Sequence, residues 1–78
     1  MKRCLRLRIY GRVQGVGFRF SAERKMNELG LAGWVRNCDE GCVETEVIGE
    51  DGAVEKYKEW CKKGPRWAKV ERAEEIWG

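Results

Sequence analysis

The sequence predicts an α+β fold in which four strands and two helices follow one another in the order β-α-β-β-α-β. Three observations predict it. Apolar residues alternate along the first segment, which is typical of a half-buried strand. They recur at helical spacing in two later segments, and glycines separate the segments from one another. The chain has 78 residues, enough for one small core. We therefore expect residues 1–78 to form a single domain.

The first strand is predicted at residues 3–10, where every second side chain is apolar. Residues 11–17 follow as a loop that contains three glycines. The apolar spacing then becomes helical over residues 18–29, with charged residues on the other face. Gly30 stands where a glycine commonly ends a helix.

A hairpin is predicted next, because residues 31–37 and 42–48 both read as strands and only the short turn 38–41 separates them. Two glycines and two acidic residues then break the chain before a short amphipathic helix at residues 53–62. The last segment, residues 68–76, reads as a weaker strand.

This order is that of the ferredoxin-like plait, an antiparallel four-stranded sheet with both helices on one face. The first and third strands are antiparallel neighbours in that topology. A register that places Arg6 opposite Glu46 also places Arg8 opposite Glu44. Opposite charges directly across a ladder stabilise each other, so the charge pattern supports the topology independently.

Composition excludes several classes of function. Sixteen Lys and Arg are interleaved with thirteen Asp and Glu, which is typical of a solvated surface rather than of a nucleic-acid-binding stripe. The chain has no histidine, which excludes imidazole-based acid–base chemistry and imidazole metal ligands. No apolar run approaches the ~20 residues that span a bilayer, and the start does not read as a signal peptide. We expect a cytoplasmic protein without nucleic-acid or membrane partners.

The four cysteines are expected to be reduced thiols, because nothing in the sequence indicates secretion. Cys38 and Cys42 could form a hairpin disulfide or contribute to a metal site, but a lone pair at this spacing is a weak signal for either. Cys4 and Cys42 would lie at opposite ends of their strand pair, too far apart for a disulfide. Cys61 falls on the apolar stripe of the second helix and is expected in the core.

The segment from Gly11 to Arg19 is the one that carries chemistry. A strand, a glycine-rich loop and a helix in succession gather backbone N–H groups at a positive helix end, where a phosphate or sulfate anion binds well. Arg19 stands at the start of the helix and adds a permanent positive charge. The loop lacks the Lys of a Walker A motif, and Val13 stands where a cysteine phosphatase has its nucleophile.

The string from Gly11 to Arg19 resembles a signature of the acylphosphatase family, and the string from Gly30 to Asn37 resembles that family's other signature. Residues 41–44 and 64–70 match its later landmarks, so the resemblance covers nearly the whole chain in order. It implies hydrolysis of small acyl phosphates to a carboxylate and inorganic phosphate, with no metal, cofactor or covalent intermediate.

The resemblance also implies roles for individual residues. Arg19 would bind the phosphate, and Asn37 would position the attacking water. The loop would contribute its backbone amides as a phosphate cradle, from Gln14, Gly15, Val16, Gly17, Phe18 and Arg19. In the predicted plait the first and second strands run parallel, so the loop and Asn37 should meet at one edge of the sheet.

Members of that family usually continue into a final strand beside the second strand, whereas this sequence stops at Gly78. We therefore expect the second strand to be an exposed edge, in a monomer or in a dimer paired through that edge. Two alternatives to an enzyme stay open. One is a phosphate-binding or regulatory plait without catalysis, such as the detached form of a domain of a larger carbamoyl-transferring maturation protein. The other is an RNA-binding plait that stacks bases on Tyr10 and Trp34, which the Arg–Glu pairs across the same face disfavour.

Overall fold

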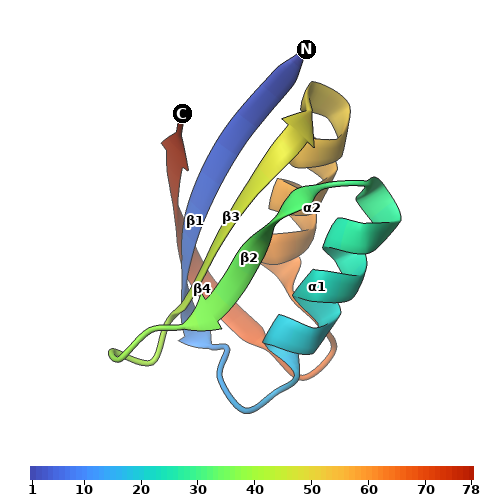
Figure 1. The fold of residues 1–78 in the computed structure, drawn as a ribbon. Helices are drawn as coiled ribbons and strands as arrows, with labels where there is room; N and C mark the ends of the chain where they lie inside the picture. Colours follow the sequence, from blue (N-terminus) through green and yellow to red (C-terminus); the bar gives the residue numbers. More distant parts are fainter.

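The computed structural model describes all 78 residues and has the predicted order of elements. The elements are β1 (Lys2–Arg12), α1 (Phe18–Leu29), β2 (Ala32–Asn37), β3 (Val43–Glu50), α2 (Asp51–Lys63) and β4 (Lys69–Trp77). The strands form one antiparallel sheet in the order β2-β3-β1-β4, and both helices cover the same face of it (Figure 1). The ferredoxin-like plait is confirmed.

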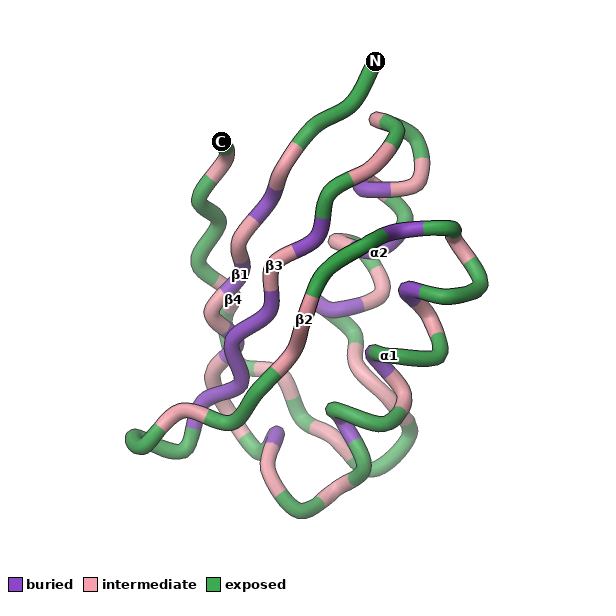
Figure 2. The backbone as a smooth tube through the Cα atoms, viewed as in Figure 1, coloured by how far each residue is buried: buried purple, intermediate pink, exposed green.

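The core lies between the sheet and the helices and is centred on β1. Leu5, Leu7 and Ile9 are each at most 1% exposed, as their alternation predicts. They pack against buried side chains of β3 and of the inner faces of α1 and α2, and Figure 2 shows these buried positions facing one another. Burying an aliphatic side chain of this size stabilises a fold by about 1.5–3 kcal/mol, so this face of β1 contributes strongly to stability.

The opposite face of the sheet carries the predicted charge ladder. Arg6 pairs with Glu46 and Arg8 pairs with Glu44 in the β1–β3 register. In both pairs the guanidinium Nη2 lies 3.2 Å from a carboxylate oxygen. The register derived from charge alone is therefore confirmed.

The end of β3 differs from the sequence prediction, which broke the chain after residue 48. The strand continues to Glu50 because the start of β1 extends far enough to pair with it, Lys2 opposite Glu50 and Arg3 opposite Gly49. The N-terminal ammonium adds an ion pair to Glu50 at 2.9 Å. As a result α2 begins at once, at Asp51, rather than two residues later.

A buried chain of hydrogen bonds links α2 to the edge strand β2. The Thr45 hydroxyl donates to the Trp34 carbonyl oxygen at 2.7 Å, which leaves the Tyr57 hydroxyl to donate to Thr45 Oγ1 at 2.8 Å. Burial raises the pKa of Tyr57 well above its ordinary value, so the hydroxyl keeps its proton.

The outer side of β2 pairs with no strand, which confirms the predicted exposed edge. Neither helix has the length and apolar character needed to cross a membrane.

Gly11 is expected to be indispensable to the β1–β4 ladder. It lies where the register shifts, with a φ of 128°, and a Cβ atom at this position would overlap the carbonyl oxygen of Lys69. We expect Gly11→Ala to lower the free energy of unfolding by about 1–3 kcal/mol, measured by urea denaturation.

Gly52 in α2 provides the matched control for Gly11. A Cβ atom there meets open space, so Gly52→Ala should raise stability by up to about 1 kcal/mol through helix propensity. A Gly11→Ala protein as stable as the wild type would show that the ladder tolerates a side chain at the register shift.

Candidate active site

The loop between β1 and α1 is fixed in the core at both ends and open to solvent between them. Val13 and Phe18 are each 1% exposed, whereas Gly15 and Gly17 are exposed. These two glycines have φ angles of 73° and 78°, a conformation that side chains disfavour. Such angles turn successive backbone N–H groups toward a common point, as in anion-binding nests.

The N–H groups of this loop have no acceptor within the protein. Nine backbone hydrogen bonds are made by turns, loops and caps, and none is donated by residues 13–20; the first donor after the loop is Ser21, to the Gly17 carbonyl oxygen at 3.0 Å. The first turn of α1 contains no acidic residue, and Gly17 offers no capping side chain. A run of free donors therefore meets the positive end of the helix dipole, which is a favourable place for an anion.

Arg19 lies in the first turn of α1 and is exposed. Arg8 and Arg36 on the sheet are engaged by a carboxylate, whereas Arg19 has no ion-pair partner. Its guanidinium keeps its donors available for a ligand beside the loop amides.

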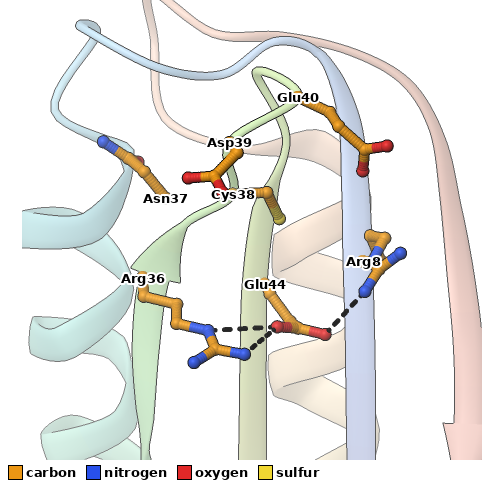
Figure 3. Close-up of a pocket in the computed structure, with 7 residues that line it drawn as sticks. All are labelled: Arg8, Arg36, Asn37, Cys38, Asp39, Glu40 and Glu44. Carbon is orange, nitrogen blue, oxygen red and sulfur yellow. Dashed lines mark hydrogen bonds and ion pairs between the residues drawn. The ribbon is translucent and has the colours of Figure 1, made fainter.

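Asn37 is the last residue of β2 and pairs with Val43 of β3. Side chains alternate along the strand, so Asn37 shares the helix-side face with Val35, and Figure 3 shows its amide directed toward the start of α1. Because β1 and β2 are both antiparallel to β3, they end at the same edge of the sheet (Figure 1). The loop and Asn37 therefore leave the sheet at the same end, as the parallel directions of the two strands predict.

Gln14 joins the loop directly to the β2–β3 hairpin. Its side-chain Nε2 donates to the carbonyl oxygens of Cys38 and Cys42, each at 2.8 Å. The sequence predicts a role only for the backbone amide of Gln14, and this side-chain contact was not predicted. The shared sheet edge predicted that loop and hairpin would be near each other, but no pattern in the sequence indicates which carbonyl groups a loop side chain will reach.

A disulfide between Cys38 and Cys42 closes the hairpin, so the prediction that these two cysteines are reduced is wrong. The turn brings the two strand ends together with their Cα atoms 5.0 Å apart, within the range that a disulfide spans. Cys4 and Cys61 are free, as predicted, and Cys61 is fully buried. Burial raises its pKa to about 12, so it remains a thiol.

An open groove of about 520 Å³ lies beside Asn37, toward the face of the sheet that the helices leave open (Figure 3). Its lining residues are Arg8, Arg36, Asn37, Cys38, Asp39, Glu40 and Glu44. Within it, the largely buried Glu44 carboxylate lies between two arginines, 2.7 Å from Arg36 Nη2 and 3.2 Å from Arg8 Nη2. The contact of Glu44 with Arg8 was predicted from the β1–β3 register, whereas the contact with Arg36 was not.

The groove therefore shares only Asn37 with the predicted site. The loop and Asn37 lie on the helix side, whereas the groove extends from Asn37 over the open face and includes neither Arg19 nor the loop. No three or more Cys, Asp or Glu side chains are grouped so that they could hold a metal ion.

Comparison with known proteins identifies the arrangement. A model of the acylphosphatase family matches residues 5–78, which is nearly the whole chain. The chain belongs to the acylphosphatase family. It is 51% identical over 71 residues to an acylphosphatase of Thermococcus kodakarensis, a match that covers 91% of this chain and 78% of that protein. It is 46% identical over 74 residues to an acylphosphatase of a Nocardioides species, covering 95% of this chain and 75% of the relative.

Solved structures of the family agree with this assignment. The acylphosphatase of Coxiella burnetii superimposes with a TM-score of 0.94 and 36% identity, covering 99% of this chain and 81% of that one. The acylphosphatase of Bacillus subtilis gives the same TM-score and identity, with coverage of 100% and 86%. Full-length HypF in a phosphate- and nucleotide-bound form is similar over 10% of its length, with a TM-score of 0.91 and 26% identity over all of this chain. Fold and family together make this chain an acylphosphatase-type enzyme.

The Glu44 carboxylate makes the stability of the fold sensitive to pH in the acid range. Hydrogen bonds from Arg36, and then from Arg8, hold the pKa of Glu44 below its ordinary value of 4.5 despite the opposing effect of burial. A carboxyl group whose pKa is lower in the folded state stabilises the fold above its ordinary pKa, and this stabilisation is lost as the pH falls through the folded value. We expect the unfolding free energy to fall from pH 6 toward pH 3, and to fall less in Glu44→Gln.

Denaturant titrations at several pH values measure this difference. Glu71 is exposed and has no ion-pair partner, so Glu71→Gln is the control and should keep the wild-type slope. Equal slopes for Glu44→Gln and the wild type would mean that the Arg36–Glu44–Arg8 cluster does not couple protonation to folding.

Proposed function

We propose that this protein hydrolyses the carboxyl–phosphate bond of small acyl phosphates, without a metal ion or cofactor, and that Arg19, the loop amides and Asn37 carry the reaction. The observation that carries the proposal is the run of unpaired N–H groups at the start of α1, beside an unpaired Arg19 and at the same sheet edge as Asn37. The family to which the chain belongs supports the reaction class.

The loop and Arg19 act on the phosphoryl group. The amides of Gln14 to Arg19 would hold the phosphoryl oxygens, and the Arg19 guanidinium would neutralise charge that the helix dipole alone only partly balances. Phosphoryl transfer depends mainly on positioning and on charge stabilisation, so a site of this composition needs no side-chain nucleophile.

Asn37 acts on water. Its neutral side-chain amide is a poor base, but its carbonyl oxygen accepts a hydrogen bond and so orients one water molecule in line with the bond that breaks. The water oxygen attacks phosphorus, the bond between phosphorus and the acyl oxygen breaks, and the carboxylate leaves with the bonding electron pair. The proton from the attacking water passes to an oxygen of the substrate's own phosphate. Because the carboxylate is a good leaving group, the absence of histidine from the chain does not obstruct this route.

A phosphate-binding plait without catalysis is the second candidate, and the likeness to a tenth of full-length HypF favours it, because there the same fold is part of a much longer chain. Both candidates bind phosphate at the loop, and only the first releases phosphate from an acyl phosphate. Their difference is therefore measurable in one assay. A monomeric or edge-paired state and a cytoplasmic location stay predictions.

The Arg19 assignment predicts a defect in both binding and turnover. Arg19→Ala should lower kcat/KM for benzoyl phosphate by about a thousandfold and abolish inhibition by inorganic phosphate, because the charged donor beside the loop is lost. Phosphate release in the presence of EDTA measures the first effect and tests metal independence in the wild type. Arg24→Ala, an exposed arginine on the same helix, is the matched control and should keep full activity.

The Asn37 assignment predicts a different kinetic signature. Asn37→Ala should lower kcat by about a hundredfold with KM and phosphate inhibition nearly unchanged, because water positioning is lost while the phosphate site remains. Asn27→Ala on the exposed side of α1 is the control. A folded wild type that releases no phosphate from benzoyl phosphate, yet binds inorganic phosphate, would instead establish the non-catalytic candidate.

A further inference from the structure

The disulfide hairpin and the phosphate loop are joined by one side chain. Gln14 Nε2 donates both of its hydrogens, one to Cys38 O and one to Cys42 O, so the residues whose sulfur atoms are bonded are also the two that accept from the loop. Each carbonyl oxygen also accepts a backbone hydrogen bond within the turn. Cys38 O accepts from Gly41 N at 3.3 Å, and Cys42 O accepts from Cys38 N at 2.8 Å. Both acceptors therefore use their full capacity.

The contact of Gln14 with the two cysteine carbonyl groups, which we call the junction, lies between the phosphate cradle and Asn37. Cys38 follows Asn37 directly in the chain, and Gln14 lies at the start of the exposed part of the loop. No other hydrogen bond or ion pair links loop residues 13–17 to hairpin residues 38–42. Apart from the strand registers that carry both segments, the separation of Asn37 from the phosphate cradle depends on Gln14 and on the placement of its two acceptors.

We propose that the Cys38–Cys42 disulfide is a positioning element for acyl phosphate hydrolysis. By closing the turn it holds two carbonyl groups where the Gln14 amide reaches both, and Gln14 in turn holds the phosphate loop in place against Asn37. The inference rests on the proposed function, and it adds that activity depends on the oxidation state of a cysteine pair that touches no substrate.

The pair is placed so that a small thiol can reach it. Cys38 is half-buried and lines the groove, whereas Cys42 is 1% exposed, so attack occurs at Cys38 Sγ (Figure 3). A dithiol reduces the bond by supplying two electrons and two protons. The cystine becomes two thiols, and the dithiol closes to its own cyclic disulfide. The turn then loses its covalent closure, and only its two backbone hydrogen bonds still limit how far the two Gln14 acceptors move apart.

The kinetic consequence is specific. The loop amides and Arg19 lie on one side of the junction, so phosphate binding should survive reduction, and inhibition by inorganic phosphate should change by less than about twofold. Asn37 lies on the other side, so water alignment should suffer. We expect kcat to fall roughly tenfold, since a displacement of an ångström in a catalytic group can cost up to about a hundredfold.

The experiment follows benzoyl phosphate hydrolysis with and without dithiothreitol in the wild type, Cys38→Ser/Cys42→Ser, Gln14→Ala and Cys4→Ser. Dithiothreitol should slow the wild type and the Cys4→Ser control alike, and removal of the reductant with reoxidation should restore both. The double serine variant and Gln14→Ala should be slow from the outset and insensitive to reductant. A wild-type kcat that changes by less than about twofold on reduction would overturn the proposal, and so would an equal reductant effect in Gln14→Ala.

A second readout does not require activity. The side-chain amide protons of Gln14 should exchange slowly with solvent in the oxidised protein and clearly faster after reduction, in NMR spectra whose other resonances confirm that the fold persists. An unchanged exchange rate would overturn the proposed junction. An oxidised wild type without acylphosphatase activity would refute the proposed function instead, while the exchange measurement would still decide whether the disulfide holds Gln14.

Discussion

The register of β1 against its two neighbours is the constraint on which the rest of the structure depends. One face of the strand is buried and the other is charged, and both faces specify the same alignment with β3. A slip by one residue would turn Leu7 to solvent and place Arg8 in the core. Because the alignment is specified twice, the end of β1 delivers its loop to a defined point. The β2–β3 register, Asn37 opposite Val43, then brings the water-orienting candidate to the same edge.

Arginines on the open sheet face and the arginine beside the loop differ in what they contact. Three arginines of the open face are held by carboxylates, Arg6 by Glu46 and Arg8 and Arg36 by Glu44. Arg19 stands at the helix start with no such partner, next to backbone amides that likewise have none. Unpaired donors contribute nothing to stability, and the loop conformation depends on glycine at two positive φ angles. The fold therefore carries a segment whose polar groups are arranged for a ligand rather than for the protein itself.

Periodic patterns predicted most of the fold, and for physical reasons. Alternation and helical spacing indicate which face of an element is buried, so they predicted α1 and the two faces of each strand. The charge pattern predicted the Arg–Glu ladder. Features that depend on a contact between distant segments could not be predicted from these patterns. The continuation of β3 to Glu50 depends on how far β1 extends, and the Cys38–Cys42 bond depends on turn geometry that a spacing of four residues leaves open. The role of the Gln14 side chain was missed because its partners are backbone carbonyl groups, which every residue possesses.

The pairing of β1 with β4 joins two strands that lie far apart in the sequence. Leu5 lies opposite Trp77, and the Gly78 amide donates to the Cys4 carbonyl oxygen at 2.9 Å. A contact between segments so far apart in the sequence carries a large loop-closure entropy, and contacts of this kind generally slow folding. During synthesis β1 precedes β4, and until β4 has left the ribosome one side of β1 lacks its partner and is open to pairing with other chains. The phosphate loop leaves from this same strand, whose last residues, Gly11 and Arg12, pair with β4, so the docking of β4 also fixes the point from which the loop departs.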